Sequence, residues 1–301
     1  MSTQSNIQPM NHAGHACLQL TTRHGTAIVA LHGAQILSWH PKGHRDVFWL
    51  STLSEPAPAA IRGGVPVCWP WFGKQGMPQG GMQHGPVRNR PWDVISVQDD
   101  SAEVISLTLA PCRATTPDDP LARFARQLQL TMRIDLQETL TQTLETRNSG
   151  MQPFVLTQAL HNYFAVQDAL QVHVAELAGL HYIDKLATSE QQTLPIQQGP
   201  FTLHENCDRI YQQHATSPTH RYTLDDRAWQ RRIHITTQGC QSLVVWNPGQ
   251  AQARTMADVP DDQWQNFLCL EAANAGSDVV TLAPGEQHQL IQTLAAEHWY
   301  A

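Results

Sequence analysis

The sequence has little charge of either sign. Only 15% of its 301 residues are charged, and the formal net charge is −7. An average globular domain has about 25% charged residues. A sparse and acidic set of charges argues against a nucleic acid or an anionic membrane surface as partner. A small anionic ligand stays open, because it requires only a local cluster of basic side chains.

Long apolar runs are also absent. No stretch approaches the about 18 apolar residues that span a bilayer. The segment Met1 to Leu20 lacks the basic and apolar regions of a signal peptide. The six cysteines are scattered without a Cys-x-x-Cys pair, which favours buried free thiols over a disulfide or zinc framework. We therefore expect a cytoplasmic protein without membrane contact, and nothing in the sequence requires more than a monomer.

Several catalytic motifs are missing. There is no Gly-x-Ser-x-Gly and no Gly-x-x-x-x-Gly-Lys-Ser/Thr, so acyl transfer and P-loop phosphoryl transfer lack their usual geometry. The closest histidine spacings, His12 with His15 and His40 with His44, do not fit a metal-binding helix. These absences disfavour a nucleophilic hydrolase, a P-loop enzyme and a metal enzyme.

Short segments with the period of β-strands fill most of the chain. Residues 126–135 alternate cleanly between apolar and polar side chains, as in a half-buried strand. Further strands are expected at 26–31, 35–39, 47–50, 94–97, 104–109, 139–146, 154–164, 170–176, 232–237, 242–246, 267–272, 279–282 and 288–294. Short helical patterns occur near 121–127 and 258–265. This pattern predicts an all-β sandwich or barrel.

Nothing in the sequence divides the chain into parts. There is no repeat, low-complexity tract or charge run, and the two expected long loops, 112–120 and 188–200, are short for interdomain linkers. We therefore expect residues 1–301 to form one domain.

One segment, residues 59–92, interrupts the strand pattern and is crowded with glycine, proline and tryptophan. No acidic residue occurs between Glu55 and Asp93. The basic residues in between are Arg62, Lys74, Arg88 and Arg90. Tryptophans offer flat walls for a sugar or a base, and arginines bind phosphate or carboxylate oxygens with two parallel hydrogen bonds. This basic segment therefore indicates a binding site for a small anion.

The sequence also resembles a known family. The motifs that carry the resemblance are Ile61-Arg62-Gly63-Gly64-Val65-Pro66-Val67-Cys68-Trp69-Pro70-Trp71-Phe72-Gly73, His84-Gly85-Pro86-Val87-Arg88, Gln158-Ala159-Leu160-His161-Asn162-Tyr163-Phe164, Asp208-Arg209-Ile210-Tyr211, Val245-Trp246-Asn247-Pro248 and Cys269-Leu270-Glu271. They resemble the hexose-6-phosphate mutarotases, the glucose-6-phosphate 1-epimerase branch of the aldose 1-epimerase family. The resemblance covers most of the chain. It implies a galactose-mutarotase-like β-supersandwich with a carbohydrate cleft, without cofactor or metal.

Glu271 and His161 are the candidates for acid and base chemistry. On a strand over 267–272, Glu271 shares a face with Phe267 and Cys269, so it is a carboxyl group in an apolar run. Such placement tends to raise the pKa of a carboxyl group. His161 lies in an apolar segment, and its pattern alone is typical of a structural histidine. The resemblance implies that Glu271 takes the proton of the C1 hydroxyl and that His161 protonates the ring oxygen.

The resemblance also implies the substrate contacts. Arg62 and Arg88 are expected to bind the phosphate with assistance from Lys74, while His84 and Asp208 hold sugar hydroxyls; the role of Arg90 stays open. The expected activity is the interconversion of the α and β anomers of D-glucose 6-phosphate.

Three alternatives remain. The chain could be a non-catalytic sugar-phosphate-binding protein, or an aldose 1-epimerase acting on free sugars. More distantly, it could be a glycoside hydrolase, if the fold paired Glu271 with Asp208 or Asp258.

Overall fold

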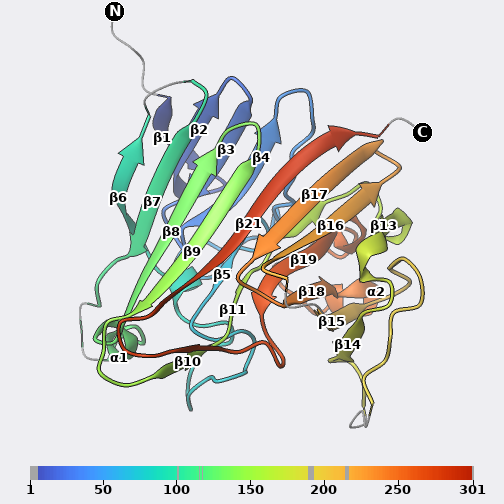
Figure 1. Cartoon of the computed structure of the whole chain (residues 1–301). Helices are drawn as coiled ribbons and strands as arrows, with labels where there is room; N and C mark the ends of the chain where they lie inside the picture. Colours follow the sequence, from blue (N-terminus) through green and yellow to red (C-terminus); the bar gives the residue numbers. More distant parts are fainter. Residues whose placement is uncertain are drawn as a thin grey trace, which may run out of the picture.

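The computed structural model describes residues 6–99, 102–114, 116, 118–188, 193–213 and 217–299, and strands dominate it (Figure 1). The helices among these residues are short. They are α1 (Ala122–Ala125), α2 (Gly249–Ala253) and the 3-10 helices η1 (Val87–Asn89), η2 (Ala169–Gln171), η3 (Ala175–Leu177) and η4 (Trp264–Asn266). None of them is long and apolar enough to cross a membrane. The prediction of an all-β protein with few short helices is confirmed.

The largest sheet has eight strands in the order β13-β16-β17-β21-β9-β8-β7-β6, and all neighbours are antiparallel. Its strands are β13 (Val172–Val174), β16 (Thr219–Asp226), β17 (Arg231–Gln238), β21 (Gln287–His298), β9 (Leu140–Asn148), β8 (Leu128–Leu136), β7 (Ile105–Pro111) and β6 (Trp92–Gln98). In Figure 1 this sheet is the broad layer that crosses the molecule from β6 to β13.

A second sheet of seven strands has the order β14-β15-β18-β19-β11-β5, with β12 also paired to β19. Its strands are β14 (His181–Asp184), β15 (Cys207–Gln212), β18 (Ser242–Asn247), β19 (Phe267–Asn274), β11 (Gln158–Leu160), β5 (Val67–Cys68) and β12 (Tyr163–Ala165).

Two smaller sheets complete the structure. A four-stranded sheet is formed in sequence order by β1 (Ile7–His12), β2 (His15–Thr22), β3 (Gly25–Ala30) and β4 (Gln35–Pro41), and a two-stranded sheet by β10 (Phe154–Leu156) and β20 (Val280–Leu282).

The main core lies between the eight-stranded sheet and the sheets packed against it. On β8, buried residues alternate with more exposed ones as the sequence predicts, and Met132 and Ile134 enter this core. From β19, Leu268 and Leu270 enter the same core, whereas Phe267 and Cys269 belong to a separate cluster. One face of β19 therefore packs in the main core, and the other face, on which Glu271 is predicted to lie, is turned away from it.

Some elements differ from the predictions. Residues 47–50 form only isolated bridges, and 258–265 is not an α-helix but a turn that ends in η4, because Pro260 interrupts it. The predicted strand 154–164 is split, since β10 leaves to pair with β20. Six strands were not predicted, namely β1, β2, β5, β14, β15 and β16. In β1 and β14 no residue is fully buried, so these strands lack a clean apolar face.

All six cysteines are free thiols, as predicted, and five of them are buried. The sixth, Cys112, is partly exposed. It lies in the predicted loop 112–120, which contains no strand among its described residues. The other predicted loop, 188–200, lies partly outside the described residues.

Candidate functional site

A cleft of about 230 Å³ opens on the face of the seven-stranded sheet that is turned away from the main core. The cross-strand register places Asp208 beside Trp246 and Val244 beside Glu271, so neighbouring strands contribute to one floor. Six of the seven residues that we expected at the site line this cleft. They are Arg62, His84, Arg88, His161, Asp208 and Glu271.

His161 and Glu271 face each other across this floor. Two short strands pair one after the other along the same edge of β19, with Leu160 of β11 opposite Ala272 and Tyr163 of β12 opposite Cys269. The same register places His161 directly opposite Glu271. The His161 Nε2 and Glu271 Oε1 atoms are 3.4 Å apart. The expected pair of a carboxyl group and an imidazole is therefore in direct contact.

Both side chains are largely withdrawn from solvent and leave one polar atom unused by the protein. Glu271 is 1% exposed and His161 is 7% exposed. Glu271 Oε2 and His161 Nδ1 are buried, and no described protein group hydrogen bonds to either atom. Buried polar atoms without a partner are rare in folded proteins. Both residues line the cleft, so they are the candidates to act on a polar ligand bound there.

The surroundings move the pKa values of the pair in opposite directions. Burial, together with the charge of Asp208, raises the pKa of Glu271 well above its usual value. Burial, together with His84 and the cations of the cleft, lowers the pKa of His161 well below 6.5. The shift of Glu271 favours its protonated carboxyl group and that of His161 its neutral imidazole, because burial penalises the charged form of each group.

Aromatic contacts orient the His161 ring. Tyr163 stacks on it with ring centroids 4.8 Å apart and planes 7° from parallel. Trp246 and His84 pack against it in T-shaped geometry, with ring centroids 6.0 and 5.8 Å from that of His161. These rings fix the direction in which the imidazole nitrogens point.

Arg62 reaches the cleft from the glycine-rich part of the basic segment. The backbone at Gly64 has φ +58°, and a Cβ there would lie 2.2 Å from the Ile36 carbonyl oxygen, so only glycine permits this close approach. The Arg62 guanidinium donates to Asp258 Oδ2 and to the Tyr163 hydroxyl, each at 2.8 Å. Arg62 is thus held in place next to the ring that stacks on His161.

Of the three cations that line the cleft, Arg88 is the one without an ion pair among the described residues. One guanidinium nitrogen donates to the Gln83 carbonyl at 3.2 Å. Its Nε is buried and has no hydrogen-bond partner among the described residues. No carboxylate of these residues forms an ion pair with the guanidinium. Arg88 therefore brings to the cleft a positive charge that no carboxylate neutralises.

His84 is neutral at physiological pH. Burial and the nearby charge of Arg88 lower its pKa to about 3. Its Nδ1 accepts a hydrogen bond from the Gly73 amide at 3.2 Å, which leaves the proton of the neutral ring on Nε2. His84 can therefore donate a hydrogen bond from Nε2, as a hydroxyl acceptor requires.

Lys185, which the sequence analysis missed, also lines the cleft. Its Nζ is 3.0 Å from Asp208 Oδ2 and 5.7 Å from the centre of the Phe72 ring. Lys185 directly follows β14, which was not predicted, and it lies outside the basic segment. Only the pairing of β14 with β15 brings it beside Asp208.

Two cations of the basic segment lie elsewhere. Lys74 is exposed in a turn and does not line the cleft, because the chain turns outward after Gly73. Arg90 donates to both carboxylate oxygens of Asp119, at 2.8 and 3.0 Å, and to the Cys112 carbonyl. Closeness in the sequence therefore does not predict which of the four basic residues line the cleft, since Lys74 and Arg90 do not.

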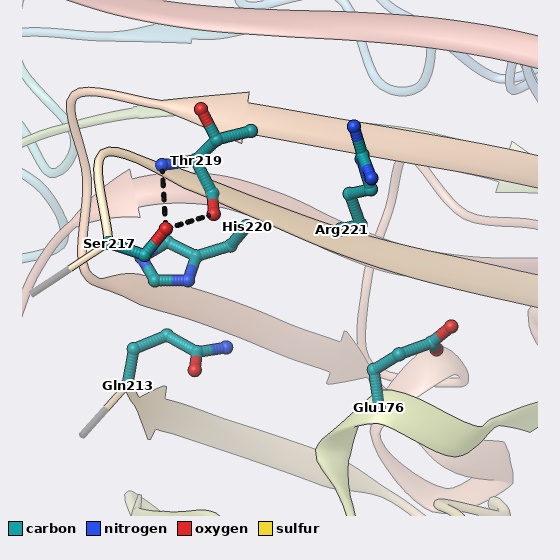
Figure 2. A pocket seen from close by; sticks show the side chains of 6 residues that line it. All are labelled: Glu176, Gln213, Ser217, Thr219, His220 and Arg221. Carbon is teal, nitrogen blue, oxygen red and sulfur yellow. Dashed lines mark hydrogen bonds between the residues drawn. The ribbon is translucent and has the colours of Figure 1, made fainter. Parts of the chain in front are cut away.

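A larger hollow of about 550 Å³ lies between β16 and η3 and is lined by Glu176, Gln213, Ser217, Thr219, His220 and Arg221. Figure 2 shows Ser217 turned onto the backbone of Thr219, while Glu176 and Arg221 lie apart across the hollow. His220 contacts Gln241 at 3.0 Å. This hollow pairs no carboxyl group with an imidazole, so the cleft around Glu271 is the better candidate for catalysis.

Over the described residues, no group of three or more histidine, cysteine, aspartate or glutamate side chains is arranged to hold a metal ion.

Comparison with known proteins identifies the family. The aldose 1-epimerase family model matches residues 16–295. A protein of Escherichia coli (strain K12), named "Putative glucose-6-phosphate 1-epimerase", is 36% identical over 253 residues, which cover 83% of this chain and 80% of that protein. A protein of the same name from Cenchrus ciliaris is 31% identical over 278 residues, covering 88% and 79%.

Solved structures agree with this assignment. A crystal structure from Salmonella typhimurium, described as a "putative mutarotase", has a TM-score of 0.84 at 28% identity and covers 99% of this chain and 95% of that one. A galactose mutarotase-like protein from Clostridium acetobutylicum shares the fold, with a TM-score of 0.73 at 13% identity and coverage of 99% and 100%. The galactose-mutarotase-like fold is thus confirmed, and the chain belongs to the aldose 1-epimerase family.

Proposed function

We propose that this chain interconverts the α and β anomers of D-glucose 6-phosphate. The observation that carries the proposal is the contact of the Glu271 carboxyl group with the His161 imidazole, 3.4 Å apart, in a cleft that Arg62, Arg88 and Lys185 also line. The names of the Escherichia coli and Cenchrus ciliaris relatives point to the same substrate.

The chemistry follows from the position of the two groups. Anomer exchange requires removal of the C1 hydroxyl proton and protonation of the ring oxygen, after which the open-chain aldehyde rotates about C1–C2 and closes on its other face. Both oxygens are bonded to C1, so a base and an acid in contact with each other can serve both. Glu271 is the base in its ionised form and His161 is the acid in its protonated form, two opposite charges that stabilise each other at this distance, and closure reverses their roles.

The remaining cleft residues recognise the substrate. His84 Nε2 and the Asp208 carboxylate bind sugar hydroxyls, and Trp246, which also lines the cleft, offers an apolar wall for the ring. Arg88 supplies an unpaired charge for the phosphate, with Arg62 and Lys185 beside it. Each charge-assisted hydrogen bond contributes about 1.5–3 kcal/mol, so two or three favour a sugar phosphate over a free sugar by orders of magnitude.

The mechanism is tested by magnetisation-exchange NMR on D-glucose 6-phosphate with Glu271→Gln. We expect exchange to fall by about 10²- to 10⁴-fold while the variant still binds the sugar phosphate. Glu138→Gln, at an exposed position, is the matched control and keeps the wild-type rate. Undiminished exchange in Glu271→Gln refutes the assigned base. Binding without exchange in the wild type supports a non-catalytic binding protein instead.

A further inference from the structure

Three fully buried amide side chains connect the eight-stranded sheet to the cleft. Asn162 and Gln292 bond to each other twice, each donating from its side-chain nitrogen to the other's oxygen at 2.8 Å. Gln292 also donates to Gln142 Oε1 at 2.6 Å. All three residues are 0% exposed.

The two glutamines occupy positions where the strand pattern calls for apolar residues. Gln142 on β9 and Gln292 on β21 are direct cross-strand partners. Leu140 and Leu144, which point to the same side of β9 as Gln142, belong to the main core. Burial of an amide is costly unless every polar atom is bonded, and Gln142 Nε2 has no partner among the described residues. Core stability alone does not explain this pair, because an apolar pair would fit the position at least as well.

The other end of the network lies beside His161. Between β11 and β12, the backbone amides of His161 and Asn162 donate to Pro66 and Leu160 rather than to β19. The connection of this kink to β19 comes from the Asn162 side chain, which donates to the Leu270 carbonyl at 2.8 Å. The Asn162 side chain is thus held between Leu270, the neighbour of Glu271, and Gln292.

We propose that Gln292 is a positioning residue, which acts through Asn162 to hold the kink that keeps the His161 imidazole against Glu271. This inference rests on the proposed function for its kinetic consequence. Small displacements of reacting groups lower rates steeply, so the kcat of anomer exchange is the sensitive quantity, whereas substrate contacts stay in place.

The kinetic test compares Gln292→Leu with Gln142→Leu, which removes the distal amide but keeps the bonds between Gln292 and Asn162. We expect kcat to fall about 10- to 100-fold in Gln292→Leu with KM within about threefold of wild type, and kcat to stay within about threefold in Gln142→Leu. Because Gln292 acts through Asn162, the double variant Asn162→Leu/Gln292→Leu should be no slower than Asn162→Leu alone. Wild-type kcat in Gln292→Leu, or losses that multiply in the double variant, overturns the inference.

A second readout does not depend on activity. The ¹⁵N chemical shifts of the His161 imidazole should change in Gln292→Leu and stay unchanged in Gln142→Leu; unchanged shifts in both overturn the inference. If Gln292→Leu does not fold, Gln142→Leu/Gln292→Leu creates an apolar cross-strand pair and takes its place. Absence of anomer exchange in the wild type would refute the proposed function, while these shifts would still decide the role of Gln292.

Discussion

Glu271 illustrates how a single residue combines function with a cost in stability. The folded protein binds the Glu271 proton more tightly than the unfolded chain does, because burial raises the pKa of Glu271 above 4.5. The free energy of unfolding therefore falls as the pH rises from about 4.5 through the raised folded-state pKa. A buried carboxyl group whose Oε2 has no hydrogen-bond partner among the described residues is retained here at the expense of stability.

We therefore predict that Glu271→Gln is more stable than the wild type at pH 8, by about 1–2 kcal/mol, and that this gain shrinks toward pH 5. Chemical denaturation at both pH values measures it. Glu138→Gln, an exposed replacement of the same kind, should leave the stability unchanged at both. A loss of stability in Glu271→Gln at pH 8 would contradict the pKa assignment.

At Arg88 the prediction concerns selectivity. Because Arg88 bonds to the Gln83 carbonyl and forms no ion pair among the described residues, Arg88→Met should remove a phosphate contact without leaving a carboxylate unpaired. We expect kcat/KM for glucose 6-phosphate to fall by about 10- to 100-fold, and the slow exchange of free glucose to stay unchanged. Arg126→Met, at an exposed position outside the cleft, is the control. Equal losses on both sugars would place Arg88 in the chemistry rather than in phosphate binding.

Several residues of the candidate site could be predicted one by one. The alternation around 267–272 put Glu271 on the correct face of its strand. Lys185 was missed because it follows a strand without a buried face. The role of Arg90 stayed open because its partner Asp119, 29 residues away, could not be recognised from the sequence.

Among the elements, the loop before η1 positions His84 through a tight backbone contact. Gly85 has φ +76°, and a Cβ there would lie 1.8 Å from the Trp69 carbonyl oxygen. Any side chain at position 85 would therefore force the backbone to move. The loop and the segment that includes β5 are therefore fixed to each other.

We predict that Gly85→Ala destabilises the protein by about 2–3 kcal/mol and lowers anomer exchange, since both the φ strain and the clash act on this loop. Gly80→Ala is the matched control, because Gly80 has a similar φ of +75° but nothing within 4 Å of an added Cβ. Gly80→Ala should cost only about 1 kcal/mol. Thermal unfolding and exchange NMR measure both variants; equal costs would show that the contact with Trp69 does not matter.

The elements themselves were predictable where one face is buried and the other is not. β8 and β9 alternate cleanly and were found nearly at their true bounds. The polar inward positions Gln142 and Gln292 carry no such signal, because their partnership spans 150 residues of sequence. Pairing between strands far apart in the sequence is a property of the fold, so the network behind His161 could not be predicted from the sequence.

For the whole molecule, the net charge of −7 hides a local arrangement. Three cations line the cleft, and two of them already have a carboxylate, Asp258 for Arg62 and Asp208 for Lys185. The remaining charge of Arg88 suits one small anion rather than a polyanion. The basic segment predicted this ligand class from sequence, although the cleft uses only two of its four cations and adds Lys185.

The central claim is that this cleft exchanges the anomers of a hexose 6-phosphate in preference to those of the free sugar. The most direct measurement is the rate of anomer exchange by NMR for the wild-type protein on D-glucose 6-phosphate and on D-glucose under identical conditions. We predict a kcat/KM at least about 100-fold higher for the phosphorylated sugar. Equal values for the two sugars would contradict the account and indicate an aldose 1-epimerase of free sugars.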